Sequence, residues 1–399
     1  MQLKFFPLSP LLLAIGLTGC QLTDNNNDNA QLESNETASL EACSEIHNNE
    51  EAISDCEVAR DGVIDVVHPN DDTLEEGAEL TDTPDMHTQA VVTDVWERAS
   101  ANFALAIPDD KRISAQRKWY LKHPEYMARV VKRAKPFLYY ITEEIEKRDM
   151  PMELVLLPIV ESAFDPFAYS HGRAAGMWQF IPGTGKRFGM QQNWWYDGRR
   201  DVVASTQGAL DYLTYLNEMF DGNWLHALAA YNSGEGRVQR AIKANKRAGK
   251  PTDFWNLNLP KETRAYVPKL LALADILKNK DEYAYAWPEV ENVAVIEVVD
   301  IGSQVDLAFA AELAGMSLKE LHGLNPGFNR WATSPEGPHR LILPLDKAAA
   351  FSQALAKIDQ KERLNWVRHS VKPGDSLGKI AKQYHTTVKV LKKVNELDS

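Results

Sequence analysis

The chain has 399 residues, 44% of them hydrophobic and 25% charged, which is typical of soluble globular proteins and leaves room for two or three domains. The net charge of −12 is uneven: residues 21–95 hold 20 acidic side chains and one Arg, so the remainder carries +7. A mildly basic folded part suits an anionic polymer, but so weak a charge is equally compatible with no such preference. No run of 18 apolar residues occurs beyond the N-terminus, which predicts no internal membrane span.

Residues 1–19 are predicted to be a lipoprotein signal peptide, with Lys4 ahead of an apolar core at 8–17. The tetrapeptide Leu-Thr-Gly-Cys that ends at Cys20 resembles the bacterial lipobox, in which the Cys is lipidated after cleavage. A disulfide is the alternative, but the small residue directly before the Cys favours lipidation. By the sorting rule for such lipoproteins, Gln21 in place of Asp implies the outer membrane. We therefore expect a lipid-anchored protein that faces the periplasm.

Residues 20–92 are expected to comprise the lipidated Cys and a disordered acidic tether. The segment is rich in Asn and Thr and poor in aromatic residues, so it buries too little apolar surface to offset the entropy of ordering. Cys43 and Cys56 lie 13 positions apart within it. In an oxidising periplasm they can close a small disulfide loop. Free thiols or metal binding are the alternatives, although no matching His pattern accompanies them.

Helical periodicity begins at Thr93, where Val95, Trp96 and Ala99 start an amphipathic helix. Two more helices are predicted between 119 and 148. Their apolar stripe is typical of core packing. We interpret residues 93–148 as a helical prefix that packs on the domain after it. The stripe consists of Val130, Val131, Phe137, Leu138, Ile141 and Ile145.

The most informative stretch is 154–182, where an apolar run ends in a single acid, Glu161. At helical spacing Leu154, Leu157 and Pro158 share a face with Glu161, so its carboxyl leaves the helix on the inward side, although Pro158 should kink that helix. A carboxyl held against apolar neighbours has a raised pKa and can donate a proton near neutral pH. On spacing alone, a solvated or capping side chain is the commoner role for such a Glu.

Residues 149–285 are expected to form a mainly α domain. Pro151 fits the first turn of a helix, and Asp201 is a good N-cap for a long helix at 202–220. A second apolar helix at 224–231 should stop at Gly234. A further helix at 265–277 is entered through Glu262 and Thr263, and few alternating β-branched runs interrupt the domain.

Four short blocks in this domain resemble, in order, those of the goose-type-lysozyme-like, soluble-transglycosylase kind of lytic transglycosylase. They are E-S at Glu161, G-x-W-Q-F-x-P from Gly176, A-Y-N-x-G from Ala230 and E-T-x-x-Y from Glu262. The resemblance covers roughly residues 149–280 and implies a lysozyme-like fold. It also implies cleavage of the β-1,4 bond between N-acetylmuramic acid and N-acetylglucosamine in peptidoglycan glycan strands, with the C6 hydroxyl closing a 1,6-anhydro ring.

The resemblance gives each matching position a role. Glu161 would act alone, first as general acid and then as base for the C6 hydroxyl, and no second carboxyl has a comparable setting in the sequence. Ile181 stands where some relatives carry Met, which leaves the finer sugar contacts open. The implied substrate-binding residues are Ser170 near the acid, Gln179 near the cleavage point, Tyr231 and Asn232 orienting the acid or the acetamide, and Tyr266 lining the cleft.

Three tryptophans, Trp178, Trp194 and Trp195, are candidates for stacking on sugar rings, with packing equally plausible for the last two. No metal-ligand spacing, phosphate loop or nucleophile elbow occurs, so we expect no metal, no cofactor and no nucleic acid, and a monomer. Two alternatives stay open. A hydrolytic goose-type lysozyme would need a second carboxylate or a positioned water, and a non-catalytic peptidoglycan-binding lipoprotein would have no need of Glu161.

The C-terminal part is expected to hold two small α+β modules. Residues 290–346 combine a strand at 293–300, two helical turns and a strand at 340–344, a β-α-α-β order that resembles a degenerate LysM module. Residues 366–399 resemble LysM more clearly and match the first segment without gaps at a distance of 70 positions, a weak internal repeat. Candidate glycan-binding residues there are Gly374, Asp375, Ser376 and Asn395.

The second module is expected to be incomplete, because the sequence ends at Ser399 before a closing strand. An open edge and half a core should leave it marginally stable, so its glycan binding stays open. The predicted architecture is therefore mainly α: a lysozyme-like catalytic domain with a helical prefix, followed by small β-α-α-β modules.

Overall fold

The computed structural model describes residues 92–364, 369–384, 388, 391, 392 and 397. Residues 88–368 form one compact unit, and residues 369–399 belong to a second one. The signal peptide, the tether, Cys20, Cys43, Cys56 and Asn395 lie outside the described residues. Within the described part of the chain, no helix is both long and apolar enough to cross a membrane.

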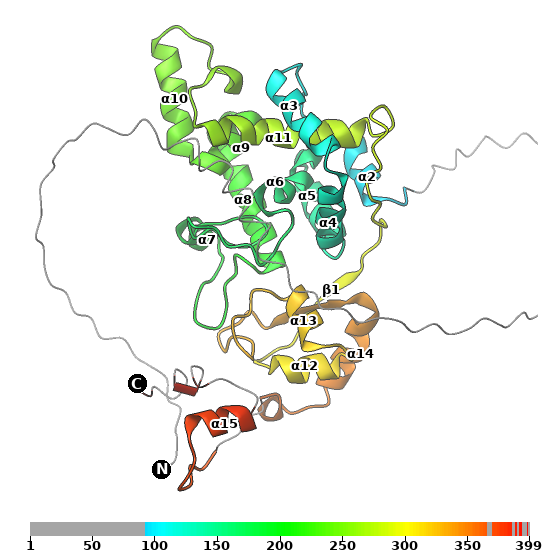
Figure 1. Cartoon of the computed structure of the whole chain (residues 1–399), viewed down its shortest axis with the longest axis vertical. Coiled ribbons are helices and arrows are strands. Elements are labelled where there is room, and N and C mark those ends of the chain that lie inside the picture. Colours follow the sequence, from blue (N-terminus) through cyan, green and yellow to red (C-terminus); the bar gives the residue numbers. More distant parts are fainter. Residues whose placement is uncertain (1–91, 365–368, 385–387, 389–390, 393–396, 398–399) are drawn as a thin grey trace, which may run out of the picture. The chain divides into compact units, whose positions relative to one another are not determined.

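The mainly helical architecture that the sequence predicts is confirmed (Figure 1). Helix α2 starts after Asp94, whose side chain accepts the Trp96 N–H at 3.2 Å, and the predicted apolar stripe is buried throughout. One helix, α3, was not predicted, because only two of its residues are buried and its periodic signal is weak. The prefix helices are α2 Val95–Ala101, α3 Lys111–Leu121, α4 Pro124–Ala134 and α5 Leu138–Glu146.

The apolar run before Glu161 does not form the single helix that its spacing predicts. It divides into a 3₁₀ helix, η1 Met152–Leu156, and a short α-helix, α6 Leu157–Ser162. Pro158 lies in the first turn of α6, where its missing N–H costs no helical hydrogen bond, and Pro151 precedes η1. The prediction of one helix was wrong because Pro158 begins a helix instead of kinking one.

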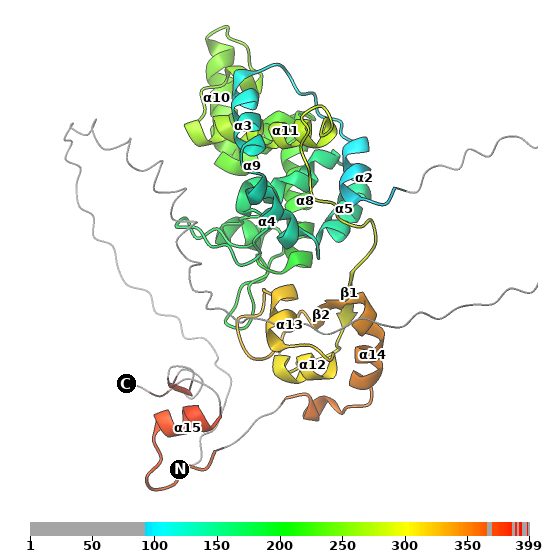
Figure 2. The same cartoon turned by 45° about the vertical axis from the view of Figure 1, so that its right-hand side comes forward.

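The later helices of this domain largely follow the predicted boundaries. Asp201 caps α8, its carboxylate accepting the Ala204 N–H at 2.8 Å, and Gly234 ends α9 with a φ of 84°. Gly234 also opens α10, which the sequence analysis did not separate (Figure 2). These elements are α7 Pro182–Arg187, α8 Val202–Met219, α9 Trp224–Ser233, α10 Glu235–Arg247, η2 Phe254–Asn256 and α11 Lys261–Lys278.

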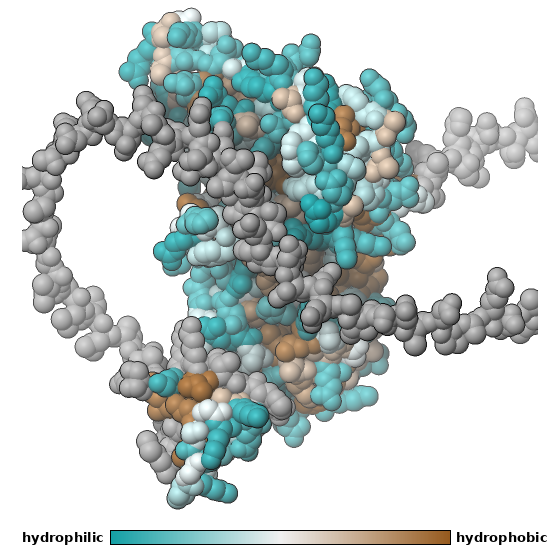
Figure 3. All heavy atoms as spheres, in the orientation of Figure 1, coloured by the Kyte–Doolittle hydropathy of each residue, from teal (hydrophilic) through white to brown (hydrophobic). Residues whose placement is uncertain are grey.

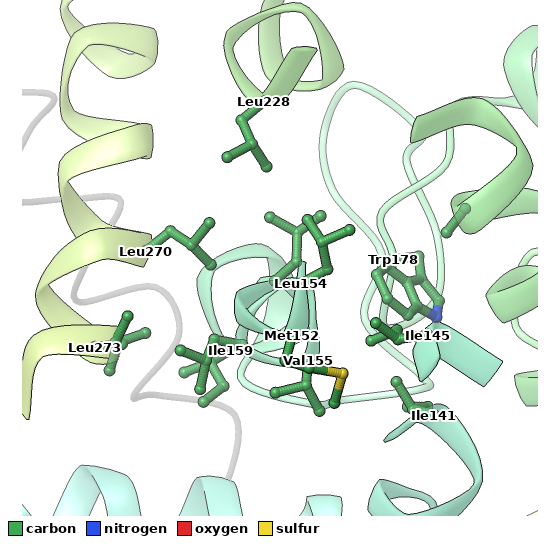
Figure 4. Packing of buried hydrophobic residues seen from close by; sticks show 14 of the residues in the cluster. Ile141, Ile145, Met152, Leu154, Val155, Ile159, Trp178, Leu228, Leu270 and Leu273 are labelled. Carbon is green, nitrogen blue, oxygen red and sulfur yellow. The ribbon is translucent and has the colours of Figure 1, made fainter. Parts of the chain in front are cut away.

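One hydrophobic core joins the prefix helices to the helices after residue 149. Figure 4 shows Val155 of η1 among side chains from α5, α9 and α11, among them Ile141, Leu228 and Leu270. Trp178 lies in this core with no exposed surface, and its indole N–H donates to the Thr206 hydroxyl at 3.1 Å. The expectation that Trp178 stacks on a sugar was therefore wrong. On the face shown in Figure 3, hydrophilic residues predominate over α3 and α10.

The predicted β-α-α-β order after residue 290 is confirmed. The two strands pair antiparallel, with Val298 opposite Ile342, and the first begins at Ile296 instead of 293. A further helix, α14, follows the second strand and packs on both strands. The elements are β1 Ile296–Asp300, α12 Leu307–Leu313, α13 Leu318–Leu324, β2 Arg340–Pro344, α14 Leu345–Leu355 and η3 Gln360–Glu362.

The second unit contains α15 Leu377–Gln383, which stands 70 positions after α12 and has the same length. Its N-cap is Ser376, whose hydroxyl accepts the Lys379 N–H at 3.2 Å. Gly374 forms a turn with a φ of 90°, and the Asp375 carboxylate accepts the Lys372 N–H at 2.8 Å. The three predicted glycan-binding residues thus shape the start of α15, and their contact with a glycan stays a prediction.

Candidate active site

Glu161 lies in the last turn of α6, where the chain reverses sharply. The next two residues, Ala163 and Phe164, have φ angles of 54° and 58°, in the left-handed region that ends a helix. The Ser162 hydroxyl donates to the Met177 carbonyl at 3.0 Å and accepts the Asp165 N–H at 3.1 Å. These bonds fix the end of α6 to the loop after it, so the direction of the Glu161 side chain is set by local structure.

The Glu161 carboxyl is half-buried, and its surroundings change its acidity. Burial raises the pKa of Glu161 to about 7. A hydrogen bond from the Tyr266 hydroxyl to Glu161 Oε1 opposes this rise, the charge of Glu262 adds to it, and that of Lys269 opposes it. At neutral pH the carboxyl is therefore present in both protonated and ionised forms, as a group that must donate and then accept a proton requires.

Two tyrosines lie near this carboxyl, Tyr266 buried and Tyr231 partly buried. Tyr266 of α11 donates to Glu161 itself, and the Tyr231 hydroxyl of α9 donates to the Trp178 carbonyl at 2.8 Å. Burial and the nearby charge of Glu161 hold the pKa of both tyrosines well above its ordinary value. Both hydroxyls therefore remain neutral hydrogen-bond donors at physiological pH.

Asn232 connects the end of α9 with the start of α11. Its side-chain oxygen accepts from the Thr263 hydroxyl at 2.8 Å, and its amide donates to Glu262 Oε1 at 3.4 Å. These two bonds hold Glu262 close to Glu161, and the charge of Glu262 raises the pKa of Glu161. The connection also holds α11, and with it Tyr266, in register with α9.

The loop from 168 to 180 carries the other two predicted residues. The Ser170 hydroxyl accepts the Ala174 N–H at 3.1 Å, and the Gln179 amide donates to the Gly176 carbonyl at 2.8 Å. Gly176 is required, because its φ is 79° and a Cβ there would lie 1.9 Å from the Arg199 carbonyl oxygen. Ser170 and Gln179 thus shape their own loop, and their bonds to a substrate stay predictions.

Four of the predicted residues, Glu161, Tyr231, Asn232 and Tyr266, come together from α6, α9 and α11. Sequence reasoning missed that Tyr266 donates to the acid and that Glu262 is its electrostatic neighbour. The four-residue spacing of Glu262 and Tyr266, which puts both on one face of a helix, was the available signal. Among the described residues, no group of three His, Cys, Asp or Glu side chains is arranged to hold a metal ion.

Comparison with known families gives three matches. The transglycosylase SLT domain family matches residues 139–254, the LysM-like domain of lytic transglycosylase MltD matches 295–360, and the LysM domain matches 369–399. The membrane-bound lytic murein transglycosylase D of Escherichia coli (strain K12) is 44% identical over 314 residues, which cover 76% of this chain and 70% of that protein.

Two further similarities are partial. A protein of Alteromonas sp. (strain M-1) named for tributyltin chloride resistance is 43% identical over 175 residues, which cover 44% of this chain and 83% of that protein. The X-ray structure of an inactive mutant of the lytic transglycosylase Slt from Pseudomonas aeruginosa aligns with 24% identity and a TM-score of 0.31, over 49% of this chain and 34% of that one.

The raised pKa of Glu161 predicts a pH-dependent cost to stability. The carboxyl has a pKa of about 7 when folded against 4.5 for the ordinary group, so the folded state loses stability as pH rises from about 4.5 through 7. Glu161→Gln, which carries no charge, should be more stable than the parent by about 1–3 kcal/mol at pH 8 and nearly equal to it at pH 4.5. Urea unfolding at both pH values measures this. A difference in stability between the two proteins that is the same at both pH values would contradict this prediction.

Tyr266→Phe should raise the pKa of Glu161 further. The hydroxyl stabilises the ionised carboxylate, so its removal favours the protonated form. An NMR titration of the ¹³C-labelled carboxyl would follow the change. Tyr231→Phe is the matched control, because that hydroxyl donates to the Trp178 carbonyl and not to the acid. A Glu161 titration that stays unchanged in Tyr266→Phe would refute the role of this hydrogen bond.

Proposed function

Because the chain belongs to the membrane-bound lytic murein transglycosylase D family, we propose that it is a peptidoglycan lytic transglycosylase in which Glu161 is the single acid and base. The bond cleaved is the β-1,4 linkage between N-acetylmuramic acid and N-acetylglucosamine, and the product carries a 1,6-anhydromuramic end. The observation that supports this most is the Glu161 carboxyl itself, whose pKa is raised to about 7 beside a neutral tyrosine donor.

The reaction uses the Glu161 carboxyl twice, first as an acid and then as a base. The protonated carboxyl first donates to the glycosidic oxygen as the bond from C1 to that oxygen breaks, which leaves an ionised carboxylate and an electron-deficient C1. The carboxylate then accepts the C6 hydroxyl proton as that oxygen bonds to C1. The acid is restored and no water is consumed. A pKa near the working pH serves both steps, because neither form of the carboxyl is too stable to react.

Tyr266 and Asn232 support these steps as positioning residues. The Tyr266 hydroxyl occupies Oε1 of Glu161 and so directs proton transfer to the other carboxyl oxygen. Asn232 holds Glu262 near the same carboxyl. The substrate's own acetamide stabilises the positive centre at C1 in this proposal, and Ser170 and Gln179 bind the glycan through the loop that they shape.

Hydrolysis is the second candidate reaction, and one observation favours it. Glu262 is a second carboxylate, and its charge raises the pKa of Glu161. Hydrolytic glycosidases use a second carboxylate as nucleophile or as base for water. Glu262 is already engaged by the Asn232 amide at 3.4 Å, which favours a structural role for it and supports the one-acid reaction.

Attachment to the outer membrane through a lipid at Cys20 completes the proposal. The lipobox-like tetrapeptide and Gln21 support it, and so does the word membrane-bound in the name of the Escherichia coli relative. The acidic tether would let the enzyme reach the cell wall from that anchor, and the two LysM-type segments would hold it on glycan. A disulfide between Cys43 and Cys56 would lie within the tether.

The products of digestion test the reaction. Purified sacculi treated with the full-length protein should release muropeptides that are one water lighter than hydrolytic products and carry 1,6-anhydromuramic ends, seen by mass spectrometry. Glu161→Gln should reduce turnover at least about a thousandfold, since proton transfer in both steps is lost. Reducing ends would establish hydrolysis instead. Near-normal turnover in Glu161→Gln would exclude Glu161 as the catalytic acid.

The lipid anchor is tested separately. Cys20→Ala should move the protein from the membrane to the soluble fraction, because no other anchor is predicted from the sequence. Immunoblots of fractionated cells, with Cys43→Ala as the matched cysteine control, measure the change. Membrane fractionation that persists in Cys20→Ala would disprove lipidation as the means of attachment.

A further inference from the structure

Arg199 is a buried arginine that no step of the proposed reaction uses. It lies between α7 and α8, and only 5% of its surface is exposed. Its Nε donates to Oδ1 of Asp197 at 2.9 Å, and its Nη2 donates to Oδ2 at 2.7 Å. Two parallel bonds of this kind fix the plane of a guanidinium as well as its position. The carboxylate thus takes up Nε and Nη2 and leaves Nη1 to bind other groups.

The Nη1 atom of Arg199 binds two backbone carbonyls of the loop from 168 to 180. It donates to the Arg173 carbonyl at 2.7 Å and to the Phe180 carbonyl at 3.1 Å. The Arg173 N–H donates in turn to the Ser170 carbonyl at 2.9 Å. Phe180 directly follows Gln179 in the chain. One nitrogen atom therefore joins the two segments of the loop that carry the predicted glycan-binding residues.

Both of these segments contain a residue in an unfavourable backbone conformation. Arg173 has a φ of 64° and Gln179 has a φ of 49°, in the left-handed region. Residues other than Gly adopt this region at a cost, and they remain there only where the surrounding contacts enforce it. One bond from Arg199 ends on Arg173 itself, and the other ends on the residue after Gln179. Arg199 therefore holds the loop at the two points where its backbone would otherwise relax.

The position of Arg199 is itself fixed from two sides. Its aliphatic stem packs on Gly185 of α7, where an added Cβ would lie 2.9 Å from Arg199 Cγ. The Asp197 N–H donates to the Gly327 carbonyl of the LysM-like domain at 2.8 Å. The pair of Asp197 and Arg199 therefore connects the loop to α7 and to the LysM-like domain, so the guanidinium is in place before any ligand binds.

We propose that Arg199 is a positioning residue for glycan binding, which sets the position of Ser170 relative to Gln179 by holding the backbone of both segments. Arg199 acts through the loop and does not touch the glycan. The inference rests on the proposed function, because Ser170 and Gln179 bind the glycan only in that proposal. A lysine at this position keeps the positive charge but lacks the planar fork that binds Asp197 and both carbonyls together.

The effect on the loop is measured without the reaction. In full-length Arg199→Lys, hydrogen–deuterium exchange of the amides in 168–180 should be at least about fivefold faster than in the parent, because the lost bonds let the loop open. Peptides from α9 and α11 should exchange as in the parent. Arg340→Lys is the matched control, since Arg340 pairs with Asp201 at 3.0 Å, and it should leave exchange in 168–180 unchanged. Parent-like exchange of this loop in Arg199→Lys would refute the proposal.

Turnover then tests whether the loop acts through its two predicted contacts. On soluble glycan strands with peptide stems, Arg199→Lys should lower kcat/KM about tenfold, mainly through KM, because glycan contacts are misplaced. The pH profile should stay that of the parent, since the groups that shift the pKa of Glu161 do not include Arg199. In a Ser170→Ala/Gln179→Ala background the same substitution should cost less than about twofold. An equal loss in both backgrounds would indicate general damage to the fold and overturn the proposal.

A second variant keeps the outcome decisive if Arg199→Lys fails to fold. Asp197→Asn keeps the shape of the pair and removes its charge, so exchange in 168–180 should be at least about twofold faster. A folded Asp197→Asn protein with parent-like exchange would refute the role of the pair. If the wild-type protein yields no anhydro products from sacculi, the proposed function fails, and the role in glycan binding fails with it. Normal anhydro products together with unchanged exchange in the variants would overturn only the inference about Arg199.

Discussion

The chemistry depends on one unfavourable placement, a carboxyl group kept at the edge of an apolar core. Water would stabilise the ionised Glu161, and the surrounding core withholds part of that solvation, so the pKa rises to about 7. The placement persists because the remaining contacts of α6 are strongly favourable: Leu157 and Ile159 are buried, and Ser162 fixes the helix end to the following loop. The protein thus gives up local stability at the position where it needs reactivity.

The other charged and polar groups around Glu161 adjust this effect in opposite directions. Glu262 makes the proton harder to remove, whereas the Tyr266 hydroxyl and Lys269 make it easier. A carboxyl influenced by burial alone would stay protonated and could not act as a base. One fully paired with a cation would stay ionised and could not act as an acid. Because α11 carries Glu262, Tyr266 and Lys269 together, the position of this single helix sets the balance between the two forms.

Much of the local structure followed from the sequence, because it depends on neighbouring residues. The Asp201 cap, the stop at Gly234 and the β-α-α-β order were all predicted correctly. The bond from Tyr266 to Glu161 joins positions 105 residues apart, and no local pattern encodes such a contact. The burial of Trp178 was missed for the same reason. The glycines of its loop suggest an exposed segment, whereas a hydrogen bond to the distant Thr206 hydroxyl holds the Trp178 indole inside. The short helices α3 and α14 were missed because only three residues or fewer of each are buried.

A buried carboxylate also connects the catalytic domain to the LysM-like domain. Asp201 caps α8 and also pairs with Arg340 of β2, so one buried carboxylate satisfies a helix end and a cation of the other domain. Gly327 is needed at the contact, because a Cβ there would lie 2.9 Å from the Tyr196 ring. A junction this closely fitted cannot act as a flexible linker. The LysM-like domain is therefore held by packing and an ion pair as well as by the connecting chain.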